Sequence, residues 1–134
     1  MDKKTEKYFV NTYIRKDRRE RLLYELSTPK KRYEGISRFC HCSKELIDPS
    51  KIAMEGDGID RDRGFTDFLA RHNEICLVLS PENCDEDLFL PLKEAMDIAS
   101  LGLDAIVIIG SCFAVVFGEP SKNGRDKFLL TEKK

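Results

Sequence analysis

The sequence has no tryptophan, only two histidines and five prolines in 134 residues, and no long apolar run. A membrane-spanning helix needs about 20 consecutive apolar residues, whereas stretches such as Ala105–Ile109 are only a few residues long. The opening residues, MDKKTEK, also lack the apolar core of a signal peptide. These absences predict a cytoplasmic protein with no membrane partner.

Cysteine is present in an odd number, five, which favours free thiols in a reducing compartment over a disulfide framework. Cys40 and Cys42 flank His41, but structural zinc sites combine two ligand pairs and no second pair follows. Nothing in the spacing brings His41 or His72 beside a cysteine that could act as a nucleophile. We therefore expect neither a metal site nor a cysteine hydrolase.

Glycine-rich phosphate loops are absent too, since neither the Walker A pattern nor G-x-G-x-x-G occurs. The acidic loop at residues 54–64 could attract a hard cation. Read as a calcium-binding loop from Asp60, however, it has Phe65 where glycine is required and Arg71 where a glutamate ligand should stand. The sequence therefore predicts no cofactor, and a non-enzymatic role is favoured over an enzymatic one.

What the sequence does contain is an uneven distribution of charge. Residues 1–51 hold 14 Lys and Arg against 8 Asp and Glu, whereas residues 52–134 hold 9 against 16. The net charge of −1 thus hides a basic N-terminal part and an acidic C-terminal part. Such a separation bears on partners more than on fold.

The N-terminal part is predicted to be helical. Apolar residues recur with a helical period over residues 6–27, which favours one continuous helix. Asp17 and Glu20 fall within its apolar stripe, which a single helix explains only if both acids are paired with arginines. The alternative is a break, in which Asp17 caps a second helix and Tyr8–Ile14 forms a strand.

Two further elements are expected before the acidic part. Thr28 and Pro29 are a good N-cap and first helical residue, and the apolar period continues from there to Cys40. Ser43 then begins a short turn. Residues 54–64 contain two glycines and no period, which predicts a loop.

The C-terminal part combines strands with short helices. Four compact apolar runs are typical of strands: residues 74–79, 105–109, 112–117 and 127–130. Helices are expected around residues 65–69 and 91–99. The last three strands are expected to form an antiparallel meander, whereas the first could gain a parallel neighbour through its following helix, which would make the sheet mixed.

Together these elements predict an α+β fold in a single domain over residues 1–134. A helical, basic part (1–53) is followed by the polar loop (54–64) and an α/β, acidic part (65–134). The helical half is expected to pack on one face of a small, mostly antiparallel sheet of about four strands.

For function, the leading hypothesis is a non-enzymatic protein-binding module that acts through a charged surface, as inhibitor or immunity-type proteins do. Clusters of one charge sign select partners and accelerate association. The partner would be a protein with a basic surface. The acidic candidates for this surface are Glu55, Asp57, Asp60, Asp62, Glu82, Asp85, Glu86 and Asp87.

The alternative hypothesis is a nucleic-acid-binding protein or metal-dependent nuclease that uses the basic helices. Phosphate binding needs several cations on one surface, and the candidates are Arg15, Arg18, Arg19, Lys30, Lys31 and Arg32. Acids interleaved among them, such as Asp17 and Glu20, favour a solvated helix surface instead.

Overall fold

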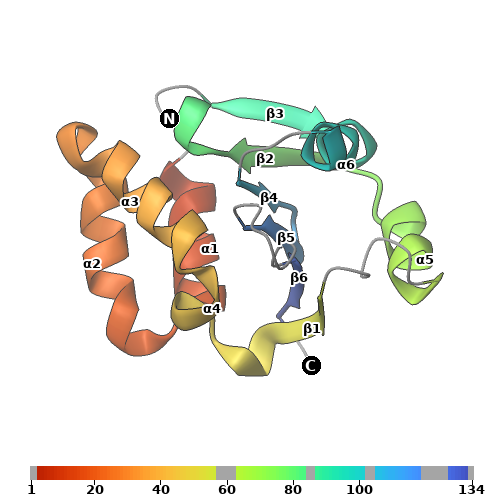
Figure 1. The fold of residues 1–134 in the computed structure, drawn as a ribbon, viewed down its shortest axis with the longest axis horizontal. Coiled ribbons are helices and arrows are strands. Elements are labelled where there is room, and N and C mark those ends of the chain that lie inside the picture. Colours follow the sequence, from red (N-terminus) through yellow and green to blue (C-terminus); the bar gives the residue numbers. More distant parts are fainter. Residues whose placement is uncertain (1–2, 57–62, 84–86, 102–104, 119–126, 133–134) are drawn as a thin grey trace.

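The computed structural model describes residues 3–56, 63–83, 87–101, 105–118 and 127–132 (Figure 1). The α-helices are α1 (Lys3–Tyr13), α2 (Lys16–Ser27), α3 (Pro29–His41), α4 (Ser43–Leu46), α5 (Arg63–Arg71) and α6 (Leu92–Leu101). Two 3₁₀ turns are η1 (Pro49–Lys51) and η3 (Pro81–Asn83). The strands are β1 (Ile52–Glu55), β2 (Ile75–Leu79), β3 (Leu88–Pro91), β4 (Ile106–Ile109), β5 (Phe113–Phe117) and β6 (Lys127–Thr131). The predicted α+β fold is confirmed.

The described strands form one sheet of six, in the order β1-β6-β5-β4-β2-β3, rather than the predicted four. The two strands that the sequence pattern does not predict, β1 and β3, have four residues each and lie at the two edges. Every pairing is antiparallel. The mixed arrangement is therefore wrong. Because β3 folds back on β2 as a hairpin, the chain has reversed before α6, and β4 pairs with β2 in the antiparallel direction.

Helices cover both faces of the sheet, with α1 to α4 on one side and α6 and α5 on the other (Figure 1). Alternate residues of each strand point to opposite faces. In β2, Leu77 and Leu79 pack with the N-terminal helices, whereas Cys76 and Val78 pack with α6. The strands read as continuous apolar runs because neither face of the sheet centre meets water.

The stretch expected as a single helix is broken between α1 and α2, so the favoured single-helix prediction is wrong. Ile14 leaves the helix to form an isolated bridge with Ile47, and the Arg15 N–H donates to the Leu46 carbonyl at 2.9 Å. Tyr8–Ile14 is not a strand, because all of it except Ile14 is helical. This break buries Ile14 completely.

The break also changes which residues share a helix face. Asp17 and Glu20 lie on the exposed side of α2, so they no longer fall in an apolar stripe. Asp17 does not cap α2: the residue at the cap position is Arg15, and no side-chain capping hydrogen bond is formed there. A tertiary contact with the α4 segment, rather than a local capping signal, therefore begins α2.

The polar loop predicted at 54–64 is shorter than expected, because its first two residues belong to β1 and α5 begins at Arg63. Residues 57–62 lie outside the described part of the chain. Among the described helices, none combines the length and the apolar character that crossing a membrane requires.

Candidate functional site

The acidic candidates that the structure describes are divided between two places. Glu55 is the last residue of β1, and Glu82 and Asp87 lie before β3; all three are exposed. β1 and β3 are opposite edges of the sheet, about 24 Å apart at the usual strand spacing. Glu82 and Asp87 therefore share an edge that Glu55 does not reach. The other acidic candidates lie outside the described residues: Asp57, Asp60, Asp62, Asp85 and Glu86.

Among the basic candidates, Arg32 is not at the surface and its assignment to a nucleic-acid surface is wrong. Only 1% of its area is exposed. Both terminal nitrogens of its guanidinium donate to the Glu6 carboxylate, and Nη1 also donates to the Leu26 carbonyl at 3.0 Å. A buried arginine is tolerated when it is paired and hydrogen-bonded in this way. Arg32 joins α3 to α1 and α2 instead of facing a partner.

The remaining basic candidates do not gather in one patch. Arg15 and Arg18 lie at the start of α2, whereas Lys30 and Lys31 lie at the start of α3, beside the end of α2. The 12 residues of α2 separate the two groups by about 18 Å. Arg19 is half-buried, and its Nε donates to the Ile14 carbonyl at 2.8 Å.

Arginines do meet at one hollow of about 260 Å³ beside the start of α2, but acids accompany them. Its charged lining residues are Asp17, Arg18, Arg21, Arg38 and Glu45. Arg38 is engaged by Glu25, with 2.6 Å between Nη1 and Oε1, and the Glu25 carboxylate also lies 3.9 Å from Arg21. The charges of this hollow largely cancel, so it lacks the excess of cations that a phosphate backbone needs.

The β2–β3 edge carries an exposed apolar surface that the sequence does not predict. Ile75 is 60% exposed and Phe89 is 47% exposed. The register places Phe89 opposite Leu77 and Ile75 opposite Pro91, so all four side chains are on the same face of the sheet. We call Ile75, Phe89 and Pro91, with the backbone of β3, the edge surface.

The hydrogen-bonding pattern of β3 follows from its pairing with β2. The Leu92 N–H donates to the Glu74 carbonyl at 2.7 Å, and these residues are directly opposite in the register that continues along both strands. In an antiparallel ladder, hydrogen-bonded pairs alternate with non-hydrogen-bonded pairs. Phe89 and Pro91 therefore belong to non-hydrogen-bonded pairs, and their backbone polar groups point away from β2.

Because β3 ends the order of the described strands, the outward N–H and C=O of Phe89 meet no further strand. Pro91 lacks an N–H at a position where that group would also point outward, which is where proline is tolerated in a sheet. β3 itself has no charged residue to discourage strand pairing. At this edge, the outward backbone N–H and C=O of Phe89 and its exposed aromatic ring therefore lie side by side.

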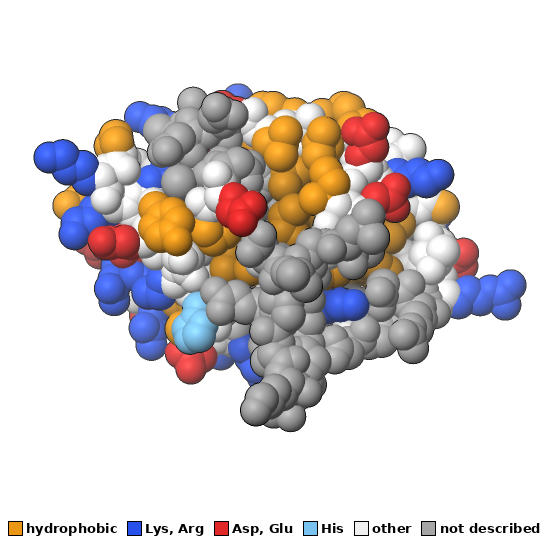
Figure 2. All heavy atoms as spheres, turned by 45° about the horizontal axis from the view of Figure 1, so that its top comes forward, with side chains coloured by type: hydrophobic (Ala, Val, Ile, Leu, Met, Phe, Trp, Pro, Cys, Tyr) orange, Lys and Arg blue, Asp and Glu red, His pale blue; other side chains and the backbone are white. Residues whose placement is uncertain are grey.

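Acidic side chains border the edge surface. With the β3 side turned forward, hydrophobic side chains gather in the view and several Asp or Glu side chains lie near them (Figure 2). Glu82 and Asp87 precede β3, and Glu74, which precedes β2, accepts a hydrogen bond from Ser111 Oγ at 2.9 Å. The edge surface therefore combines apolar contact area with a negative border.

The described residues contain no convergent catalytic or metal-binding arrangement. No group of three or more His, Cys, Asp or Glu side chains there could hold a metal ion. Cys40 is buried in the core while His41 is exposed. The side chains of the Cys40–Cys42 segment therefore do not converge on a common position where a metal ion could bind. Burial, with a smaller effect of Glu74, raises the pKa of Cys76 to about 11, which keeps this thiol protonated at neutral pH.

No family model, curated protein or solved structure matches the chain. The edge surface is consequently interpreted from its own geometry. Its acidic border includes Glu82 and Asp87, which sequence reasoning singles out. Ile75 and Phe89 are missed because their exposure depends on β3 being an edge strand. The apolar triplet Leu88-Phe89-Leu90 is the signal that could have indicated that strand.

Proposed function

We propose that this chain is a non-enzymatic protein-binding module whose partner adds a strand to the β3 edge. The observation that carries this proposal is Phe89, which combines a 47% exposed ring with outward backbone groups that no described strand occupies. Edge strands of this kind bind extended peptides, where main-chain hydrogen bonds supply affinity and side-chain contacts supply specificity.

The apolar residues and the acidic border of the edge surface indicate what kind of segment the partner would supply. A strand added beside β3 would place alternate apolar side chains against Phe89 and Pro91, which are on the same face of β3, since successive residues of a strand point to opposite faces. Basic residues flanking that segment would meet Glu82 and Asp87. The expected partner is therefore a protein with an extended, apolar segment bordered by Lys or Arg, and its association rate should fall as ionic strength rises.

The nucleic-acid hypothesis has less support. Arg32 is buried, the exposed cations are divided between the two ends of α2, and an acid pairs with Arg21 and Arg38 in the hollow beside the start of α2. Protein binding at the edge surface does not depend on these basic residues.

Site-specific photo-crosslinking tests the location. A photoreactive benzoylphenylalanine replaces Phe89 in one variant and Tyr33 in the control, because Tyr33 is a comparably exposed aromatic residue (56%) on α3. We expect ultraviolet light to join position 89, and not position 33, to one discrete protein. Adducts at position 33 alone, adducts to nucleic acid, or equal adducts at both positions would reject the proposal.

A further inference from the structure

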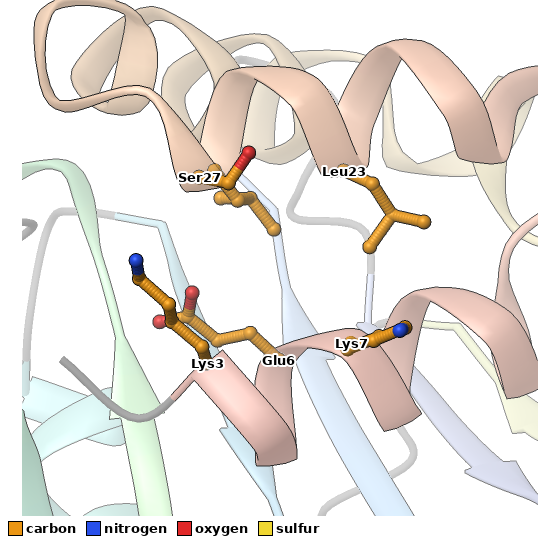
Figure 3. Close-up of a pocket in the computed structure, with 6 residues that line it drawn as sticks. Lys3, Glu6, Lys7, Leu23 and Ser27 are labelled. Atoms are coloured by element: carbon orange, nitrogen blue, oxygen red, sulfur yellow. The ribbon is translucent and has the colours of Figure 1, made fainter.

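A second surface feature lies between α1 and α2. It is a groove of about 350 Å³ lined by Lys3, Glu6, Lys7, Leu23, Leu26 and Ser27. Lys3 and Lys7 extend from α1 toward the two ends of the groove, and Leu23 points from α2 toward α1 near Lys7 (Figure 3). The groove thus has an apolar floor and a basic rim.

The floor of the groove carries no uncompensated charge. Glu6 is only 3% exposed, and the buried Arg32 guanidinium satisfies both of its carboxylate oxygens. Leu26, 6% exposed, and the half-buried Leu23 supply the apolar surface beside it. A ligand entering here therefore meets hydrocarbon rather than an exposed carboxylate.

Among the described residues, the rim has two positive charges that no ion pair compensates. Lys3 and Lys7 are four residues apart on α1, so they are neighbours on one helix face. Both are exposed, and neither forms an ion pair with another described residue. Two unpaired ammonium groups above an apolar floor are complementary to a molecule with a hydrocarbon body and an anionic head.

We infer that this groove binds a single-chain carboxylate amphiphile, of the class of a medium-chain fatty acid. Its volume is at the small end of the range for small-molecule sites, about 300–1,000 Å³. A docked helix would instead need apolar contacts along several turns. The hydrocarbon chain would lie on Leu23 and Leu26, and the carboxylate would accept charge-assisted hydrogen bonds from the Nζ atoms of Lys3 and Lys7. This inference is independent of the edge surface.

Titration with decanoate, well below its micelle concentration, tests the inference by two-dimensional amide NMR. We expect shift changes confined to α1 and α2 around the groove. The variant Lys3→Gln/Lys7→Gln removes both charge-assisted hydrogen bonds and should raise the Kd at least about tenfold. The matched control Lys16→Gln/Lys44→Gln also removes two exposed lysines, but none that lines the groove, and should leave the Kd unchanged.

Decanol separates the charged interaction from general hydrophobic adsorption, because it has the same chain without the carboxylate. Decanoate should bind markedly more tightly than decanol. Equal binding of the two, equal effects of the two lysine pairs, or shift changes centred on the edge surface would overturn the inference. So would the absence of decanoate binding together with binding of an acidic helical peptide, because the groove would then be a protein contact.

Discussion

Glu6 and Arg32 show how a charged pair can organise an otherwise apolar layer. Arg32 has 1% of its area exposed and reaches from α3 to Glu6 on α1 and to the Leu26 carbonyl of α2. Burying such charges costs free energy that only the partner and further hydrogen bonds offset. The pair therefore specifies how the three helices pack together. Removing either residue alone would leave the other one buried with an uncompensated charge.

Replacing Glu6 by glutamine tests this role. The Glu6→Gln variant leaves Arg32 buried without an anion, so we expect the free energy of unfolding to fall by about 3–5 kcal/mol. The matched control is Glu34→Gln, because Glu34 pairs with Lys31 at 3.9 Å on the exposed surface and should cost less than about 1 kcal/mol. Urea unfolding measures both.

An apolar double variant completes this test. Glu6→Leu/Arg32→Met removes both charges together, and it should be less destabilised than Glu6→Gln alone. Equal losses of stability in Glu6→Gln and Glu34→Gln would contradict the assigned role of the buried pair.

Helices and strands differ in how far the sequence predicts them. The N-terminal helices follow from the helical period of their apolar residues, and the buried strands follow from continuous apolar runs. The break at Ile14 does not, because it results from a bridge to Ile47, 33 positions along the chain. β1 and β3 are not predicted from the sequence for a related reason. Whether a four-residue segment forms an edge strand depends on the strand it pairs with rather than on its own sequence.

Helix starts illustrate the same difference between local and tertiary signals. Asp48 caps η1, since its Oδ1 accepts hydrogen bonds from the Ser50 N–H at 3.0 Å and the Ser50 hydroxyl at 2.8 Å. These bonds, the backbone N–H first, lower the pKa of Asp48. Asp17, which the alternative interpretation of the sequence suggests as a cap, instead lies 3.8 Å from Arg18 on the exposed surface.

We expect Asp48→Ala to lower the free energy of unfolding by about 1 kcal/mol, the usual effect of a lost cap. Asp17→Ala should change it by less than about 0.5 kcal/mol. Because the folded state lowers the pKa of Asp48, its contribution is present above the ordinary aspartate pKa of 3.8 and is lost as pH falls through the folded value. Urea unfolding at pH 7 and at pH 3 measures the free energy of unfolding of each variant. The difference between Asp48→Ala and the unaltered protein should be smaller at pH 3 than at pH 7.

For the molecule as a whole, the charge separation of the sequence has a structural counterpart. The basic part forms the helical layer on one face of the sheet, and acids border the edge surface. Sequence reasoning identifies Glu82 and Asp87 because charge is visible in the sequence. It misses Ile75 and Phe89 because an apolar residue becomes a binding candidate only when the fold leaves it exposed.

The comparison of Phe89→Ala with Phe89→Pro tests strand addition most directly, using the partner captured by crosslinking. Both variants lose the ring, but only proline removes the outward N–H. Proline should be tolerated at position 89 as it is at Pro91, which thermal unfolding checks. Tyr33→Ala is the control that should leave the Kd unchanged.

We expect Phe89→Ala to raise the Kd about 30-fold, as for an aromatic hot spot. Phe89→Pro should raise the Kd about a further tenfold, because a carbonyl of the partner loses its donor. Equal Kd values for these two variants, or values equal to that of the unaltered protein, would contradict the account.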